Sequence, residues 1–325
     1  MTRDAAREVA AATLPDGRTL GVRLAAASDV DALVRVIHRA FEARPVIGAR
    51  PDALRDDAAA VAAVVATGSG YVAELDGEPV GVTLAGRRPD GSIRLGRVSV
   101  LPEHRRAGIA SFLIGVVLDD LAMAGETAVH LLARQEYPQI EAWWVRHGFA
   151  RAGAEGDCWV MARALPVAVE VPDADAMRAL GRRLAPLLRA GDLVIASGDL
   201  GAGKTTLTQG LGAGLRVGGP VISPTFVLSR VHPPLGDGPA LVHVDAYRLG
   251  TAAELEDLDL DASLADSVTV VEWGTGVAET LASDRLEVDI RRGLDADDET
   301  RWVFLTPIGA RYDRDELARA ARGDA

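Results

Sequence analysis

The 325-residue chain is 48% hydrophobic and 25% charged, so it is long enough for two domains with ordinary hydrophobic cores. Its formal net charge of −12 argues against a broad electrostatic grip on nucleic acid, because phosphate binding needs clustered Lys and Arg. No apolar run approaches the length of a membrane span and the N-terminus has no apolar signal segment, so we expect a cytoplasmic protein that contacts no membrane.

Residues 1–164 form the first predicted domain, an α/β domain with a mixed sheet. A capping-box pattern at Ser28 and Asp31 marks the start of its first helix, and Asp-Gly turns at 76–77 and 90–91 join the strands of an antiparallel meander. The predicted elements are a strand over 19–25, a helix over 28–43, the meander, a helix over 108–124, a strand over 128–133, a helix over 140–148, and short strands near 149 and 159–161.

A glycine loop follows the meander, where Arg105–Ala110 fits the pattern R-x-x-G-x-A between a strand and a helix. Together with the later segment WWVRHGF, it resembles the GNAT acyltransferase family over about residues 17–163. The resemblance implies that loop N–H groups bind the pyrophosphate of acetyl-CoA at a helix N-terminus, and that strand backbone contacts the pantetheine arm. The residues it implies for these contacts are Arg105, Arg106, Ala107, Gly108 and Ala110 for the pyrophosphate, and Val98 and Val100 for the arm.

The acid and base of such a transferase are harder to place. In RimI-like GNAT members a tyrosine four residues before the Gly-Phe pair protonates the departing thiolate, and Trp144 stands at that position. The strand over 92–100 has no carboxylate, which leaves Glu103, Glu136 and Tyr137 as candidate bases. We therefore expect acetyl-CoA binding with slow transfer to peptide N-termini and an unidentified acceptor. The alternative is a CoA-binding module that has lost acyl transfer.

Residues 165–325 form the second predicted domain, in which strands alternate with helices around a mainly parallel sheet. Its segment Gly198–Thr205 fits G-x-x-x-x-G-K-[ST], between an apolar strand and an apolar-periodic helix. Within it, Lys204 is the only lysine among 35 basic residues, and a compact ammonium can reach the β- and γ-phosphates where a guanidinium is too bulky. The residues predicted to bind nucleotide there are Gly198, Gly201, Ala202, Gly203, Lys204, Thr205 and Thr206. ATP is favoured, because no lysine remains for the guanine-reading motif N-K-x-D.

Two apolar strands of this domain end in acids, Asp245 and Glu272. Because parallel strands share one carboxyl edge with the phosphate loop, we expect both carboxylates to face the γ-phosphate. The hydroxyl of Thr205 is expected to serve Mg²⁺. His243 lies on the same strand face as Asp245 and is predicted to be packed or to support a ligand, since no Cys or His cluster surrounds it.

Four motifs in order resemble the TsaE (YjeE) family, the bacterial ATPases of the tRNA threonylcarbamoyladenosine system: GDLGAGKTTLTQGL, SPTFVL, HVDAYRL and VVEW, within about residues 167–308. The resemblance implies a P-loop fold, ATP with Mg²⁺, and association with TsaD and TsaB, whose complex is reset by ATP hydrolysis. It implies that Lys204 contacts phosphates, that Thr205 and Glu272 bind the metal, and that Asp245 supports hydrolysis. Contact with tRNA is expected only through these partners. The residues implied to line the nucleotide or partner surface are Trp273, Ser223, Thr225 and Arg248.

Some expectations and alternatives remain beside this interpretation. The family usually continues Glu-Trp-Pro-Glu, whereas Gly274 and Thr275 follow Trp273 here, so we expect a more flexible loop. The charged tail from Arg311 is expected to be a solvated face or to cover a partner. A small-molecule kinase is a weaker alternative, because only Arg248 lies close to a matched motif as a candidate lid arginine.

Overall fold

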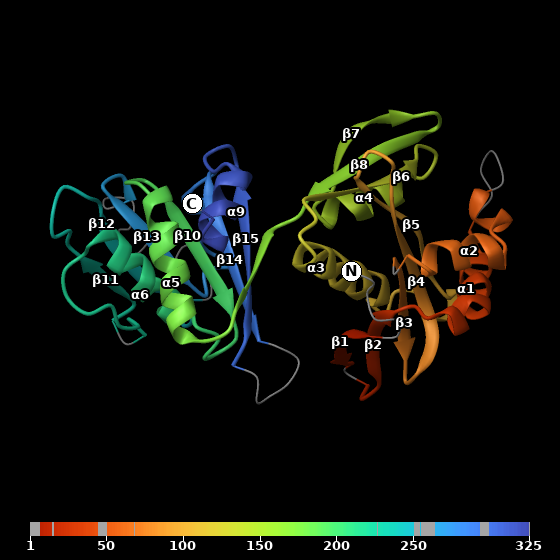
Figure 1. The fold of residues 1–325 in the computed structure, drawn as a ribbon, viewed down its shortest axis with the longest axis horizontal. Coiled ribbons are helices and arrows are strands. Elements are labelled where there is room, and N and C mark those ends of the chain that lie inside the picture. Colours follow the sequence, from red (N-terminus) through yellow and green to blue (C-terminus); the bar gives the residue numbers. More distant parts are fainter. Residues whose placement is uncertain are drawn as a thin grey trace. The chain divides into compact units, whose positions relative to one another are not determined.

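The computed structural model describes residues 7–14, 16–44, 51–67, 69–225, 227–249, 254, 264–292 and 299–324. The chain divides into two compact units, Met1–Leu165 and Pro166–Ala325, and each unit has its own sheet (Figure 1). Among the described residues, no helix is long and apolar enough to cross a membrane.

The first unit has an eight-stranded sheet in the order β1-β2-β3-β4-β5-β6-β8-β7. Its neighbouring strands are antiparallel except β5 and β6, which run parallel, so the predicted mixed sheet is confirmed. The strands are β1 (Glu8–Thr13), β2 (Thr19–Leu24), β3 (Gly70–Leu75), β4 (Glu78–Arg87), β5 (Ile93–Val100), β6 (Ala128–Arg134), β7 (Ala150–Glu155) and β8 (Cys158–Ala164).

Helices cover both faces of this sheet. Figure 1 shows α1 and α2 on one side of β4 and β5 and α3 on the other, and the apolar faces of these helices are buried. The helices are α1 (Val30–Glu42), α2 (Ala58–Val65), α3 (Ile109–Met123) and α4 (Pro138–Arg146), with the 3₁₀ turns η1 (Ala27–Asp29), η2 (Asp52–Arg55) and η3 (Pro102–His104). Strand β1 and helix α2 were not predicted, because their alanine-rich sequences lack clear periodicity.

Helix α1 does not begin with the predicted capping box of Ser28 and Asp31. Its N-cap is Asp29, and no side-chain cap bond is formed there. Instead, Oδ2 of Asp29 accepts a hydrogen bond from the backbone N–H of Ala26 at 2.6 Å. The same oxygen forms an ion pair with Arg23 at 2.7 Å. The capping-box prediction was wrong because Arg23, in β2, binds the carboxylate of Asp29, the residue just before α1 begins.

The second unit has a seven-stranded sheet in the order β11-β12-β13-β10-β14-β15-β9. Its four central strands, β12, β13, β10 and β14, are parallel, as predicted, and antiparallel strands flank them. The strands are β9 (Val167–Val171), β10 (Leu193–Gly198), β11 (Ser229–His232), β12 (Ala240–Asp245), β13 (Ser267–Glu272), β14 (Arg285–Arg292) and β15 (Arg301–Ile308). The helices are α5 (Ala174–Leu184), α6 (Lys204–Leu215) and α9 (Arg314–Arg322), with η4 (Ala185–Leu187) and η5 (Glu279–Leu281).

Helix α6, which follows the glycine loop, is held against α5 at very short range. A Cβ on Gly210 would lie 2.3 Å from the carbonyl oxygen of Arg178, and a Cβ on Gly181 would lie 2.5 Å from that of Leu207. Only glycine permits this approach of two helix backbones. The glycine-rich sequence of α6 therefore fixes the helix whose N-terminus carries Lys204.

The charged tail is not simply a solvated face, which corrects that expectation. Helix α9 buries Leu317, Ala318 and Ala321 in the core that it shares with α5 and α6. The side chain of Arg183, in α5, donates hydrogen bonds to the backbone carbonyls of Ala320 and Ala321 near the end of α9. An amphipathic face thus packs the tail onto its own unit.

Candidate functional site

The loop between β10 and α6 has a backbone that only glycine accommodates at two positions. Gly198 has φ 135°, and a Cβ there would lie 2.3 Å from the carbonyl oxygen of Ile290; Gly203 has φ 114°. The N–H of Ala202 donates to the carbonyl of Asp199 at 3.0 Å and closes the turn. The loop therefore brings its backbone to the N-terminus of α6, where N–H groups lack intrahelical partners and favour an anion.

Lys204 is buried at the start of α6, with 4% of its surface exposed. Its Nζ donates hydrogen bonds to the carbonyl oxygens of Gly198 at 2.7 Å and Asp199 at 3.0 Å, and lies 3.7 Å from the ring centroid of Trp273. Burial lowers the pKa of Lys204, and the nearby carboxylates, Glu272 foremost, oppose that shift. The ammonium is thus held within its own loop by weak neutral acceptors that a phosphate oxygen can replace.

Thr205, Glu272 and His243 form a hydrogen-bonded chain across three elements. The hydroxyl of Thr205, in the first turn of α6, donates to Oε1 of Glu272 at 2.8 Å, and Nε2 of His243 lies 2.7 Å from the same oxygen. Since an ionised carboxylate only accepts, Nε2 is the nitrogen that carries a proton. The Nδ1 atom of His243 is buried without a hydrogen-bond partner among the described residues. His243 therefore orients the carboxylate of Glu272, a supporting role that the sequence interpretation allowed.

Asp245 occupies the neighbouring strand end, in register with Glu272 across β12 and β13. Its Oδ2 accepts hydrogen bonds from the hydroxyls of Thr225 at 2.6 Å and Ser223 at 3.3 Å, and its Oδ1 accepts one from the backbone N–H of Tyr247 at 3.0 Å. Both strand-end carboxylates are buried, with 4% and 3% of their surfaces exposed. The Ser-Pro-Thr segment thus fixes the orientation of Asp245 directly.

Aromatic side chains border this edge. Trp273 follows Glu272 in the left-handed region, at φ 61°, and its backbone N–H donates to the carbonyl of Ala196 at 2.9 Å. Its ring meets that of Tyr247 edge to face, with centroids 5.2 Å apart, and Tyr247 is 64% exposed. Tyr247 was not among the predicted site residues, although the HVDAYRL motif contains it. Arg248 is exposed on the same turn.

The loop after Trp273 is packed, contrary to the greater flexibility expected from Gly274 and Thr275. A Cβ on Gly274 would lie 2.8 Å from Cγ1 of Val271 and 3.0 Å from Cβ of Ala278. Its carbonyl accepts hydrogen bonds from the N–H groups of Val277 and Ala278. Glycine serves here to allow close contact with β13.

The donor set fits a magnesium–nucleotide complex better than a metal held by protein alone. Across the described residues, no group of three or more His, Cys, Asp and Glu side chains is placed to hold a metal ion. Thr205 and Glu272 offer two oxygens within 2.8 Å of each other, beside the phosphate loop. Because Mg²⁺ is usually held by one or two protein ligands together with phosphates and water, these two residues suit it when a nucleotide is bound.

In the first unit, the loop before α3 also has an unusual backbone. Arg106 has φ 67° and Gly108 has φ 77°, and Gly108 is the N-cap of α3. Ala107 lies between them, and Ala110 lies in the first turn of the helix. Alternating left-handed residues turn successive N–H groups to one side, which makes a concavity suited to an anion. The backbone of the R-x-x-G-x-A segment therefore has the form expected of a phosphate loop.

The side chain of Arg105 is engaged elsewhere, at the C-terminal end of α1. It donates to the carbonyl oxygens of Ala40 at 2.7 Å and Ala43 at 3.4 Å. Arg44, which no sequence motif marked, donates from Nη2 to the carbonyl of Val98 at 3.2 Å. Burial, followed by the charge of Arg105, lowers the pKa of Arg44 to about 10. Two guanidinium groups therefore lie near the strand segment predicted to contact pantetheine.

Strand β5 parts from β6 early. The parallel pairing covers only Ile93 with Val129 and Arg94 with His130, so Val98 and Val100 lie beyond it. Val100 instead pairs with Gly81 on β4. At Val98 and Val100, the positions predicted to contact the pantetheine arm, β6 therefore does not pair with the backbone of β5.

The WWVRHGF segment packs α4 onto its surroundings. Trp144 is 6% exposed and meets the ring of Phe149 at 4.9 Å, while Trp143 stacks on His147 at 3.9 Å. Nε2 of His147 lies 3.0 Å from the hydroxyl of Ser111 in α3. Trp144 is thus a packing residue in the position where the family resemblance expects an acid.

None of the three candidate bases stands out in the structure. A backbone hydrogen bond and the nearby Arg39 lower the pKa of Glu103, which makes it a weaker base. Glu136 forms an ion pair with Arg134 at 2.9 Å, and Tyr137 is 5% exposed.

Comparison with known proteins explains the second unit. The family model described as threonylcarbamoyl adenosine biosynthesis protein TsaE matches residues 171–301. The tRNA threonylcarbamoyladenosine biosynthesis protein TsaE of Streptomyces coelicolor is 67% identical over 138 residues, which cover 42% of this chain and 93% of that protein. The chain belongs to the TsaE family. A crystal structure of YdiB from Bacillus subtilis also aligns with this TsaE-family chain, at 30% identity and a TM-score of 0.38. The alignment covers 49% of this chain and 95% of YdiB.

The family likeness does not extend over the first unit, which matches a different model. The model described as acetyltransferase (GNAT) domain covers residues 66–151. The PaiA N-acetyltransferase of Thermoplasma acidophilum, solved in complex with coenzyme A, aligns over 45% of this chain and 98% of its own, with 13% identity and a TM-score of 0.40. The match to the GNAT family model shows that this TsaE-family chain carries a GNAT domain before its TsaE domain.

Proposed function

We propose that residues 165–325 bind ATP with Mg²⁺ at the glycine loop and hydrolyse it, and that this ATPase acts with TsaD and TsaB in threonylcarbamoyladenosine modification of tRNA. The observation that carries the proposal is the meeting of Lys204, Thr205 and Glu272 at the carboxyl edge of the sheet. Contact with tRNA runs through the partner proteins, because the chain has a net charge of −12.

Each residue of this edge has a distinct part in the proposed reaction. Lys204 and the loop N–H groups hold the phosphates, and Thr205 with Glu272 holds the cation, which neutralises charge on the phosphates. Asp245, fixed by Ser223 and Thr225, orients the attacking water. In this proposal, nucleotide is also bound by the remaining loop residues, Gly198, Gly201, Ala202, Gly203 and Thr206. Trp273 and Arg248 line the nucleotide or partner surface.

Nucleotide turnover by the full chain tests the ATPase proposal. Phosphate release from Mg-ATP is measured first with no acceptor and then after addition of TsaB and TsaD, beside a Lys204→Ala control. We expect release without any acceptor and a change in its rate when both partners are present. Turnover that requires a small molecule and yields its phosphorylated form would favour a kinase instead.

We also propose that residues 1–164 bind acetyl-CoA and act as an N-acetyltransferase. The support is the phosphate-loop backbone at Arg106 and Gly108, beside the early parting of β5 from β6. Transfer to RimI-type peptide N-termini should be slow, because Trp144 supplies no usable acid. The alternative, a module that binds coenzyme A without catalysis, keeps the loop and lacks the base.

Equilibrium binding of acetyl-CoA to the full chain, together with thiol release over varied amines and peptides, separates these two roles. Gly108→Val is the matched loop variant, because a β-branched residue disfavours φ 77°. Binding that this variant weakens, with thiol release for at least one amine, supports the transferase. Binding with no release for any amine favours the non-catalytic module, and absence of binding overturns both.

A further inference from the structure

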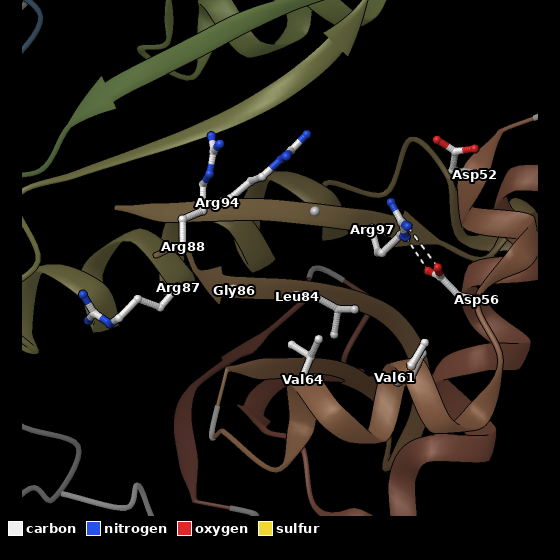
Figure 2. Close-up of a pocket in the computed structure, with 12 residues that line it drawn as sticks. Asp52, Asp56, Val61, Val64, Leu84, Gly86, Arg87, Arg88, Arg94 and Arg97 are labelled. Atoms are coloured by element: carbon white, nitrogen blue, oxygen red, sulfur yellow. Dashed lines mark hydrogen bonds and ion pairs between the residues drawn. The ribbon is translucent and has the colours of Figure 1, made fainter. Parts of the chain in front are cut away.

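The first unit has a cavity of about 510 Å³ between its sheet and one helical segment. Residues of η2 and α2 form one wall, and β4 and β5 form the other (Figure 2). The volume lies in the range of pockets that bind small molecules. It is lined by Asp52, Asp56, Ala60, Val61, Val64, Leu84, Gly86, Arg87, Arg88, Arg94, Gly96 and Arg97.

The lining is positively charged, although the whole chain is acidic. Four arginines face two aspartates, which leaves an excess of positive charge in a protein whose net charge is −12. The charges are not evenly neutralised. Arg97 forms a two-pronged ion pair with Asp56, one contact of which is 2.9 Å (Figure 2). Arg87 pairs with Glu126, which lies outside the lining.

Arg88 and Arg94 are the two guanidinium groups left over. Neither forms an ion pair with a carboxylate in the part of the chain that the structure describes, and Figure 2 shows both away from the Arg97–Asp56 pair. Nη1 of Arg88 lies 3.3 Å from Nε2 of His130, the register partner of Arg94 on β6. Burial, followed by the charges of these two arginines, lowers the pKa of His130, and the charges of Asp90 and Glu155 oppose that shift.

The floor of the cavity is open because two glycines lie there. A Cβ on Gly86 would meet no atom within 4 Å, and one on Gly96 would meet only the carbonyl oxygen of Leu84, at 4.0 Å. Both glycines have ordinary backbone angles, so a larger side chain fits the fold while it fills the cavity. Val61 and Val64 on the opposite wall, in α2, add an apolar surface, and Leu84 adds to it from β4, beside the two glycines.

The cavity lies on the same strand as the predicted cofactor arm. Arg94 and Gly96 precede Val98 and Val100 along β5, and Arg94 marks the last pairing with β6 before the two strands part. A ligand anchored by Arg88 and Arg94 would therefore lie close to the point at which acetyl-CoA is expected to enter. A guanidinium pair without carboxylate partners is suited to a carboxylate, which it can bind through paired hydrogen bonds.

We propose that this cavity is the acceptor site of the acetyltransferase unit and that it takes a small amine bearing a carboxylate, anchored by Arg88 and Arg94. The inference rests on the proposed acetyl-CoA-dependent function. In the step, the neutral amine nitrogen attacks the thioester carbonyl carbon, a C–N bond forms and the C–S bond breaks. One amine proton leaves, and one proton joins the sulfur, which gives an amide and coenzyme A thiol.

The test uses the full chain, acetyl-CoA, and acceptors in matched pairs. L-Aspartate and L-glutamate are each compared with the diamide of the same amino acid, which has the amine but no carboxylate. A basic peptide completes the set. We expect thiol release with the acids and much less with the diamides or the peptide. The variants Arg88→Gln and Arg94→Gln should raise KM for the acids by about tenfold while the Kd of acetyl-CoA stays unchanged.

Two further variants sharpen the result. Gly96→Leu fills the cavity and should abolish use of the acids without loss of acetyl-CoA binding. Arg18→Gln removes an exposed guanidinium that pairs with Asp16, away from the cavity lining, and should change neither constant. A KM for the acids that neither cavity arginine variant raises would overturn the inference.

The remaining outcomes are also decisive. Diamides or the basic peptide acetylated as well as the acids would overturn the acceptor assignment, and so would acids that bind in calorimetry and are not acetylated. Acids that do not bind at all would overturn it as well. Absence of acetyl-CoA binding to the wild-type chain would overturn the transferase function itself, so the two failures are distinguishable.

Discussion

The hydroxyl of Thr205 donates a hydrogen bond to Oε1 of Glu272 at 2.8 Å, although 67 residues separate the two in sequence. The contact joins the first turn of α6 to the end of β13. It exists because β10 and β13 are parallel neighbours, so the strand that leads into the glycine loop ends beside the strand that ends in Glu272. The proposed cation site is therefore built by strand order.

The solitary lysine gives the first prediction. Lys204→Ala should abolish ATP turnover, and Lys204→Arg should retain less than about a tenth of it, because contacts to transferring phosphates contribute orders of magnitude. The Lys204 side chain is buried, and a bulkier planar guanidinium does not match its compact ammonium. Single-turnover phosphate release measures both. Unchanged thermal unfolding of each variant is the control, and an active arginine variant would contradict the geometric argument.

The two strand-end acids should separate in their effects. Glu272→Gln removes a charge from the proposed cation site and should weaken Mg-ATP affinity, whereas Asp245→Asn should slow hydrolysis with less loss of binding. Titration calorimetry gives the affinity, and single-turnover kinetics gives the rate. Equal losses in both constants for both variants would show that the roles are not divided in this way.

His243 is a positioning residue in this scheme. His243→Leu removes the donor to Glu272 and should lower Mg²⁺ affinity by about 10–100-fold, while His243→Gln, which keeps a donor at similar reach, should recover part of the loss. The readout is the Mg²⁺ concentration that gives half-maximal turnover. If both variants lose activity with no change in that concentration, the histidine acts only through packing.

Helix α9 should contribute to the stability of the second unit. Leu317 is 1% exposed, so Leu317→Ala should destabilise this unit by about 2–5 kcal/mol, and the exposed Arg319→Ala should have little effect. Hydrogen exchange of the backbone amides of the second unit, measured in increasing urea, shows which segments lose protection in each variant. Equal protection in the two variants would mean that the tail does not belong to the core.

The first unit should lose stability in acid through Asp29. The hydrogen bond from Arg23 holds the pKa of Asp29 below its usual value of 3.8, so the ionised pair stabilises the fold above that pH. This stability is lost as pH falls through the lower pKa of the folded state. Asp29→Asn should therefore cost about 1–3 kcal/mol at neutral pH and nothing in strong acid.

Asp16 provides the matched control, because it also pairs with an arginine, Arg18, but both side chains are exposed. Asp16→Asn should leave the unfolding temperature nearly unchanged across the same pH range, since exposed ion pairs contribute little. A constant difference between Asp29→Asn and the wild-type chain at every pH would show that ionisation of Asp29 is not linked to folding.

The sequence by itself determined the main elements and the local chemistry of this protein. Short segments were enough to predict the strands and helices, the glycine loop around Lys204 and the acids that end β12 and β13. Propensity and motif spacing act over a few residues, so a local stretch of sequence is sufficient for each of them. The family resemblances rested on the same short segments, and the comparisons agree with both of them.

The tertiary structure decided what depends on contacts between distant segments. The donor from His243 to Glu272, the burial of α9 and the Arg23–Asp29 pair that replaced the predicted capping box all join residues that no sequence pattern links. The cavity that leaves Arg88 and Arg94 without carboxylate partners among the described residues arises in the same way. Strand order and packing fix such distances, and a local pattern carries no information about either.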